Sequence, residues 1–218
     1  MKIKEIFASI QGEGPYVGYK QLFIRFCGCN LHCSYCDTEF DAWDAKDYTL
    51  EEVLKIIDSH KDCHSVSLTG GEPLLFKEFI KDLAKKSALP VYLETNGTMP
   101  EALSEVIDYV TYVSADIKLP CATGLNPFWK EHDQFFRIAS KKKLFAKAVF
   151  NSDITEQEIM EMSFLCKKYD IELILQPMME GIVPTVDSDF MQQVLDRCLQ
   201  YYPKVRLIPQ VHKFINVI

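Results

Sequence analysis

The chain has 218 residues, of which 48% are hydrophobic and 25% are charged, and its formal net charge is −7. This acidic balance argues against a nucleic-acid-binding protein, because phosphate binding requires clustered Lys and Arg, and residues 141–143 form the only basic run. The sequence has no signal peptide and no apolar stretch long enough to span a membrane, so we expect no membrane partner.

Predicted strands and helices alternate along the chain from residue 22 onward. The first strand is predicted at 22–26 and leads into a cysteine-containing loop at 27–38. Thr49 as N-cap and Glu52 at the capping-box position predict a helix that runs to about Ser59. In chain order, the pattern then predicts a strand at 65–68, a helix at 74–86, a strand at 91–94, a helix at 101–106, a strand at 109–115, a helix at 131–142, a strand at 144–150, a helix at 155–168, a strand at 171–175, a helix at 189–201 and a strand at 205–208.

This alternation predicts an α/β fold in which βαβ units form a mainly parallel sheet. About six repeats fit between residues 22 and 209, which is too few to close an eight-stranded barrel. No linker or low-complexity tract interrupts them, so we expect a single domain over residues 1–218, with 119–130 as its least regular internal segment.

Polar segments follow the predicted strands, at the strand ends where such sheets bind ligands. Each segment taken alone is also compatible with ordinary turn chemistry. Their coincidence at one edge of the sheet predicts a binding site there. The segments are the cysteine loop and residues 70–73, 94–97, 114–118, 151–152 and 176–177.

Three cysteines of the loop, Cys29, Cys33 and Cys36, have a spacing that suits a metal cluster. Four-iron clusters usually have four cysteine ligands, so a set of three would leave one iron free to bind another molecule. Zinc is the alternative, with Cys27 as a fourth ligand, although Cys27 lies at the end of the strand. Eight cysteines without an export signal indicate a reducing, cytoplasmic compartment. The remaining four are expected to be buried or incidental thiols: Cys63, Cys121, Cys166 and Cys198.

Together with the sequence GGEP at 70–73, this loop resembles that of the radical S-adenosylmethionine (SAM) enzymes. The resemblance implies a partial (βα)6 barrel and one [4Fe–4S] cluster, held by Cys29, Cys33 and Cys36, whose free iron binds SAM. Lys118 could pair with the SAM carboxylate or be a surface lysine. The resemblance places eight residues around the cofactor: Tyr35, Cys36, Asp37, Gly71, Glu72, Gly97, Ser152 and Gln176.

Further segments resemble the 7-carboxy-7-deazaguanine synthases of the queuosine and 7-deazapurine pathway. They are SIQGEG at 9–14, Arg25, CDT at 36–38 and the segment 210–218. The sequence SADIK at 114–118 departs from the Ser-Pro-Lys of several members and is similar to the glycyl-radical activating enzymes.

This resemblance implies conversion of 6-carboxy-5,6,7,8-tetrahydropterin to 7-carboxy-7-deazaguanine with loss of ammonia. It also implies a homodimer, an electron from flavodoxin or ferredoxin, and Mg²⁺ bound by Thr38. Segment 210–218 would close the substrate site, with its apolar residues 214–218 packed against the protein. The residues implied for substrate binding are Ile10, Gln11, Gly12, Arg25, Thr95, His212 and Ile218.

The residues leave alternatives open. Arg25 offers a planar fork for a carboxylate, but it could equally form a structural pair with an acid. The alternative functions are a glycyl-radical activating enzyme, a radical SAM enzyme acting on another heterocycle, and a non-catalytic Fe–S or zinc module.

Overall fold

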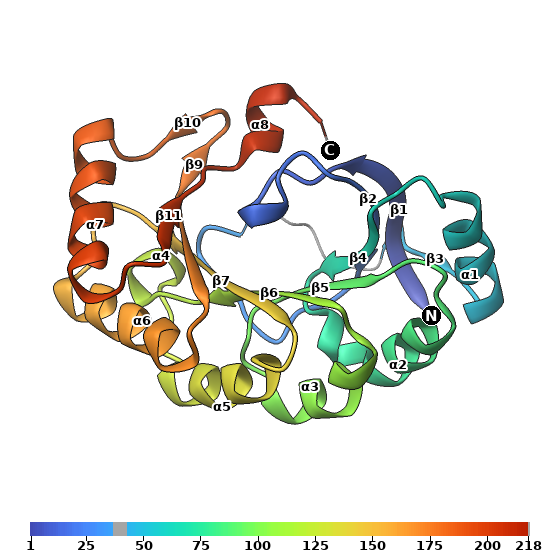
Figure 1. The fold of residues 1–218 in the computed structure, drawn as a ribbon. Coiled ribbons are helices and arrows are strands. Elements are labelled where there is room, and N and C mark those ends of the chain that lie inside the picture. Colours follow the sequence, from blue (N-terminus) through green and yellow to red (C-terminus); the bar gives the residue numbers. More distant parts are fainter. Residues whose placement is uncertain (37–42, 218) are drawn as a thin grey trace.

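The computed structural model describes residues 1–36 and 43–217. Within them, the main sheet has the strand order β11-β8-β7-β6-β5-β4-β2-β1-β3, and it curves into a partial barrel (Figure 1). Two strands at one edge, β1 (Lys2–Ile10) and β3 (Lys46–Asp47), are antiparallel to their neighbours. The other seven are parallel: β2 (Lys20–Phe26), β4 (Ser65–Gly70), β5 (Val91–Thr95), β6 (Tyr112–Ile117), β7 (Lys143–Phe150), β8 (Glu172–Pro177) and β11 (Val205–Leu207).

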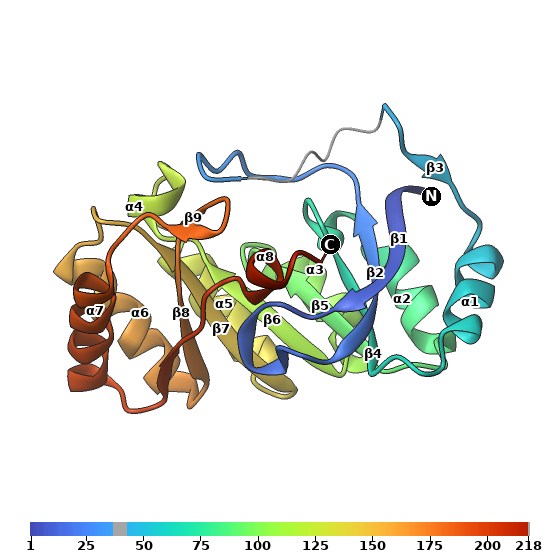
Figure 2. The same ribbon diagram turned by 90° about the horizontal axis from the view of Figure 1, so that it is seen from above.

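Helices connect successive parallel strands and cover the outer face of the sheet (Figures 1 and 2). The capping box predicted at Thr49 and Glu52 is present, and a second one joins Thr155 to Glu158. The connecting helices are α1 (Leu50–Ser59), α2 (Lys77–Lys86), α3 (Pro100–Val106), α5 (Trp129–Ala139), α6 (Glu156–Tyr169) and α7 (Ser188–Tyr201).

Six βα units followed by β11 therefore make a partial barrel, which confirms the predicted α/β fold with a mainly parallel sheet. One large hydrophobic core fills the space between the sheet and the outer helices. None of the helices in the described part of the chain is long and apolar enough to cross a membrane.

Aromatic side chains form a floor in the barrel interior, near the amino ends of the parallel strands. Tyr16, in the short turn η1 (Gly14–Tyr16), inserts among them, with its ring centroid 4.9 Å from that of Tyr112 and 5.6 Å from that of Tyr92. Because side chains alternate between the faces of a strand, Glu94 and Lys147 also face the interior, one layer above this floor. The buried cluster that Tyr16 enters consists of Tyr92, Tyr112, Phe145 and Ile174.

Several elements differ from those expected. Strand β1 was not predicted, and the strand expected at 109–115 begins only at Tyr112, because Ile107–Tyr109 forms a turn of 3-10 helix, η3. The irregular segment 119–130 contains a short helix, α4 (Pro120–Thr123). A hairpin of β9 (Met179–Glu180) and β10 (Val183–Pro184) and a last helix, α8 (Val211–Ile215), lie near the carboxyl end of the barrel (Figure 1).

Candidate active site

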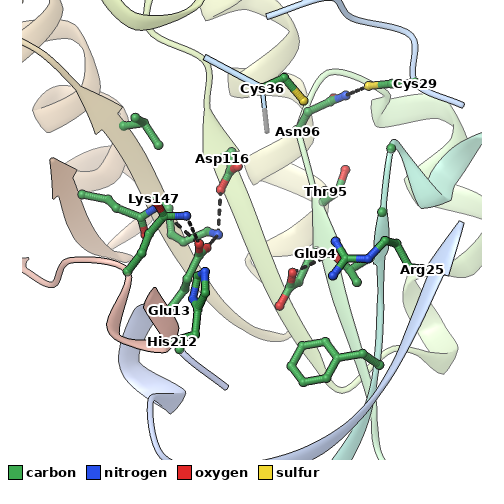
Figure 3. Close-up of a pocket in the computed structure, with 18 of the residues that line it drawn as sticks. Glu13, Arg25, Cys29, Cys36, Glu94, Thr95, Asn96, Asp116, Lys147 and His212 are labelled. Carbon is green, nitrogen blue, oxygen red and sulfur yellow. Dashed lines mark hydrogen bonds and ion pairs between the residues drawn. The ribbon is translucent and has the colours of Figure 1, made fainter. Parts of the chain in front are cut away.

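A cavity of about 630 Å³ opens at the carboxyl ends of the strands. Its walls come from β1, β2 and β4 to β8, the turn after β1, the cysteine loop and the segment that begins at Gln210 (Figure 3). Twelve of the residues predicted for the site line this cavity: Ile10, Gln11, Gly12, Arg25, Cys29, Cys33, Tyr35, Cys36, Gly71, Thr95, Gln176 and His212.

The three predicted cluster ligands face the cavity, whereas Cys27 is buried and does not. None of the eight cysteines, which all lie in the described segments, forms a disulfide. Cys29 Sγ accepts a hydrogen bond from the backbone N–H of Leu31, with an N···S distance of 3.4 Å. Thiolates are the ligands that iron–sulfur clusters require, so the donor set fits such a cluster. Among the described residues, no three His, Cys, Asp or Glu side chains are placed to hold a single metal ion.

The GGEP turn is joined directly to the start of the cysteine loop. The N–H of Gly71 donates to the carbonyl of Phe26 at 3.2 Å, and the N–H of Glu72 donates to the carbonyl of Gly28 at 2.9 Å. A Cβ on Gly71 would overlap the Gly28 carbonyl, so only glycine allows this approach. The turn therefore sets the position of the loop that carries the cluster ligands.

We expect Gly71→Ala to prevent stable cluster assembly, because its methyl group would push the backbone of the cysteine loop away from β4. Iron content after anaerobic reconstitution measures the effect. Gly181→Ala is the matched control, since Gly181 lies in an exposed hairpin where an added Cβ meets nothing within 4 Å. Normal iron loading of Gly71→Ala would contradict this account.

Glu72, predicted to bind the cofactor, directs its fully buried carboxylate into the protein instead of lining the cavity. It accepts hydrogen bonds from the Thr95 hydroxyl at 2.8 Å and from the backbone N–H groups of Asn96 at 2.8 Å and Leu74 at 3.0 Å. Burial raises its pKa to about 7, against the opposing effect of these donors. Glu72 thus links the turn after β4 to the turn after β5.

Two further residues predicted near the cofactor do not line the cavity. Gly97 has φ +69°, and a Cβ there would lie 2.9 Å from Nδ1 of the buried His132, so this glycine provides a close packing contact. Ser152 is exposed in the loop after β7. Three other predicted residues, Asp37, Thr38 and Ile218, lie outside the described residues.

A chain of charged groups crosses the cavity. Lys147 pairs with Glu13 and lies 3.3 Å from Asp116 (Figure 3). Lys118 lies 3.0 Å from Asp116 and donates to the Tyr35 hydroxyl at 2.9 Å. Burial by itself would raise the pKa of both acids. The lysines outweigh it, which lowers the pKa of Glu13 to about 2 and also lowers that of Asp116. Lys118 is therefore paired within the site and is not a surface lysine.

The carboxyl-terminal segment packs on the turn that follows β1. The N–H of Val211 donates to the carbonyl of Gly12 at 2.9 Å, and His212 lies so close to Gly12 that a side chain there would overlap it. The amide of Gln210 donates to Glu13 Oε1 at 2.8 Å. The expected burial of residues 214–218 is wrong for Phe214 and Ile215, which are 50% and 48% exposed.

Arg25 joins the cavity wall while paired with an acid. Its Nε donates to Glu5 Oε1 at 2.6 Å, and its guanidinium carbon lies 5.6 Å from the ring centroid of Phe7. The structural pair with an acid is therefore present, and it orients a side chain that still faces the cavity.

Lys147 lines the cavity but belongs to no segment predicted for the site. Five other polar lining residues without a predicted individual role lie in predicted segments: Glu13, Glu94, Asn96, Asp116 and Gln210. A signal for Lys147 was present in the sequence. Side chains two residues apart on a strand share a face, so Lys147 lies on the face of Phe145 and Val149, just as Glu94 lies on the face of Tyr92.

A partial βα barrel with three cysteines beside a GGEP turn is the arrangement of a radical SAM enzyme, and the model of the radical SAM superfamily matches residues 23–179. The chain is 36% identical to 7-carboxy-7-deazaguanine synthase of Geobacter sulfurreducens, over 99% of this chain and 97% of the relative. It is 37% identical to that of Archaeoglobus fulgidus, over 98% and 97%. The chain belongs to the 7-carboxy-7-deazaguanine synthase family of radical SAM enzymes.

A solved structure shares the fold. The crystal structure of QueE from Escherichia coli superposes with a TM-score of 0.68 at 22% identity, covering 97% of this chain and 94% of that one.

Proposed function

We propose that this enzyme converts 6-carboxy-5,6,7,8-tetrahydropterin to 7-carboxy-7-deazaguanine with loss of ammonia. The observation that carries the proposal is the identity of more than a third over nearly the whole length of 7-carboxy-7-deazaguanine synthases. The cavity supports it, because about 630 Å³ lies within the size range of small-molecule sites.

Cys29, Cys33 and Cys36 would hold the cluster, with SAM beside Tyr35 and Gly71. When bound, the cluster supplies the electron that cleaves SAM, and SAM then supplies the group that abstracts hydrogen from the substrate. The chain positions the two molecules: Arg25 offers its guanidinium to the substrate carboxylate.

Exclusion of water from the site would come from two parts of the chain. The aromatic cluster around Tyr16 lies one layer below Glu94 and Lys147 of the cavity wall, and the segment 210–217 covers the turn after β1. A closed site protects a reactive intermediate from side reactions.

The test is anaerobic turnover of the reconstituted protein with SAM and the carboxytetrahydropterin, followed by mass spectrometry. We expect 7-carboxy-7-deazaguanine and one equivalent of ammonia. SAM cleavage without this product would favour a radical SAM enzyme for another heterocycle. Formation of a glycyl radical on a protein substrate would favour an activating enzyme.

Thr38 would ligate a Mg²⁺ ion that contacts the substrate, since a hard cation prefers oxygen ligands. We expect Thr38→Ala to weaken the dependence of turnover on Mg²⁺ while SAM binding is retained. A magnesium titration of turnover, with SAM binding measured in parallel, checks this. An unchanged magnesium response would remove Thr38 from the role.

The remaining proposals concern the surroundings of the enzyme. The electron would come from flavodoxin or ferredoxin, the protein would act in the cytoplasm as a homodimer, and Ile218 would join the substrate site. Eight cysteines without a disulfide support a reducing compartment.

A further inference from the structure

Glu94 projects into the cavity from β5 and is held there by neutral donors. Its Oε1 accepts hydrogen bonds from the Gln11 amide at 2.8 Å and the Ser67 hydroxyl at 3.3 Å, and its Oε2 accepts one from the Thr69 hydroxyl at 2.8 Å. These contacts come from the turn after β1 and from the neighbouring strand β4. Glu94 therefore has a fixed orientation, with acceptor capacity remaining on Oε2, since a carboxylate oxygen can accept more than one hydrogen bond.

Gln11 holds Glu94 and has its own donors committed. One amide hydrogen goes to Glu94 and the other to Gln21 Oε1 at 2.9 Å, while Gln11 Oε1 accepts from the N–H of Glu13 at 3.0 Å. Gln11 is also buried. Both amide hydrogens of Gln11 are thus committed within the protein, and one of them orients Glu94.

Unlike the other cavity acids, Glu94 has no direct ion pair, although Lys147 attracts its charge from beyond ion-pair distance. Glu13 pairs with Lys147, Asp116 pairs with both lysines, and Glu5 pairs with Arg25. No Lys, Arg or His nitrogen of the described residues lies within ion-pair distance of Glu94. A partly buried carboxylate without a direct ion pair favours a ligand that brings a hydrogen-bond donor.

Arg25 and Glu94 lie on the same wall of the cavity, because Thr69, which donates to Glu94, is the register partner of Arg25 (Figure 3). A cation beside an acceptor is complementary to a ligand that carries a carboxylate next to an N–H group. The tetrahydropterin has this pair, because its ring N5–H is adjacent to the carbon that bears the carboxylate. In the oxidised, aromatic 6-carboxypterin the same nitrogen has no hydrogen and is an acceptor.

We propose that Glu94, held by Gln11 and Thr69, accepts the N5–H of the substrate and so selects the reduced over the oxidised pterin. The proposal rests on the proposed function. Two acceptors facing each other repel, so the oxidised ring would leave Glu94 without a partner and bring a lone pair against it.

The test compares binding of the two pterins, by anaerobic calorimetry on the reconstituted enzyme with SAM, for the wild type and Glu94→Gln. We expect the wild type to prefer the reduced pterin at least about tenfold, as charge-assisted hydrogen bonds allow. Glutamine keeps the contact with Gln11 and presents an amide donor to the ligand. The variant should therefore bind the reduced pterin at least about tenfold more weakly and the oxidised one as well as or better than the wild type does.

The controls separate this role from others. The exocyclic amino group is present in both pterins. If Glu94→Gln weakened the binding of both pterins equally, Glu94 would either contact that group or only maintain the structure of the site, and the proposal would be overturned. Unchanged binding of both would also overturn it. Glu105→Gln, on the outer helix α3, should leave both affinities unchanged.

Thr69→Val provides a second variant in case Glu94→Gln does not fold. It removes one donor to Glu94 and should weaken the reduced pterin selectively, by a smaller factor, and equal effects on both pterins would count against the proposal. If the wild type turns over the reduced pterin but the variant keeps the wild-type preference for the reduced over the oxidised pterin, only the role of Glu94 is wrong. A wild type that neither binds nor converts it defeats the proposed function and this inference together.

Discussion

Replacing any one of Cys29, Cys33 and Cys36 with alanine is expected to abolish turnover and to leave the protein without a stable four-iron cluster. All three side chains line the cavity, and a site with three local ligands has no spare thiolate to replace a lost one. Iron and sulfide content after anaerobic reconstitution, together with the absorption spectrum, measures cluster formation independently of activity.

Cys27→Ala is the matched control for these variants. Cys27 is 6% exposed and does not line the cavity, so its loss should leave the iron content at about four atoms per chain and lower stability only modestly. If Cys27→Ala lost the cluster and one of the other three retained it, the assignment of ligands would have to be revised.

Sequence reasoning could predict the elements whose signals are local. The capping boxes at Thr49 and Thr155 are formed within one helical turn, and both helices begin where they predict. Strand β1 was missed because its sequence KIKEIFASI mixes charged and apolar residues, as suits a strand near the edge with only part of its surface buried. Residues 109–111 have side chains that suit a strand, but Tyr109 ends the turn η3 and the strand begins only at Tyr112.

The residues of the site also divide into those with a local sequence signal and those that depend on the fold. The cysteines and Gly71 belong to contiguous motifs, so the sequence could identify them without the fold. Asp116 and Lys147 meet because they are register partners in β6 and β7, and register between parallel strands depends on the packing of the whole sheet. A pattern within one segment contains no information about that pairing.

Glu72 shows a different limit of prediction from sequence motifs. The motif predicts a residue of the cofactor site, and the structure places its carboxylate beneath that site, on Thr95 and Asn96. A motif identifies a turn that the site requires, but it does not say which side chains of the turn face the ligand.

Lys147→Met is expected to destabilise the folded protein by at most about 3–5 kcal/mol, because it leaves the partly buried Glu13 without its cation. The Lys147 side chain is 7% exposed and contacts both Glu13 and Asp116, whereas Asp116 retains Lys118 as a partner. Glu13 keeps hydrogen bonds from Gln176 and Gln210, which do not neutralise its charge. Denaturant unfolding of the wild type and the variant measures the difference.

Two controls test whether the loss comes from an unpaired buried charge. Lys168→Met breaks an exposed pair with Asp133, whose side chains are 58% and 39% exposed, and should cost less than about 1 kcal/mol. Adding Glu13→Gln to Lys147→Met removes the uncompensated charge and should restore part of the stability. A double variant no more stable than Lys147→Met alone would point to lost packing instead.

The contribution of Glu13 to the pH dependence of stability should also change sign between the wild type and Lys147→Met. In the wild type its pKa is lowered from 4.5 to about 2, so this contribution is fully present above pH 4.5 and is lost as the pH falls through 2. In Lys147→Met, burial dominates and raises the pKa of Glu13 above its ordinary value. The folded variant then binds a proton more readily than the unfolded chain, and it should gain stability relative to the wild type as the pH falls from 7 toward 5. Unfolding measured across that range decides the matter: parallel curves for the two proteins would mean that Lys147 does not hold Glu13 in its charged form.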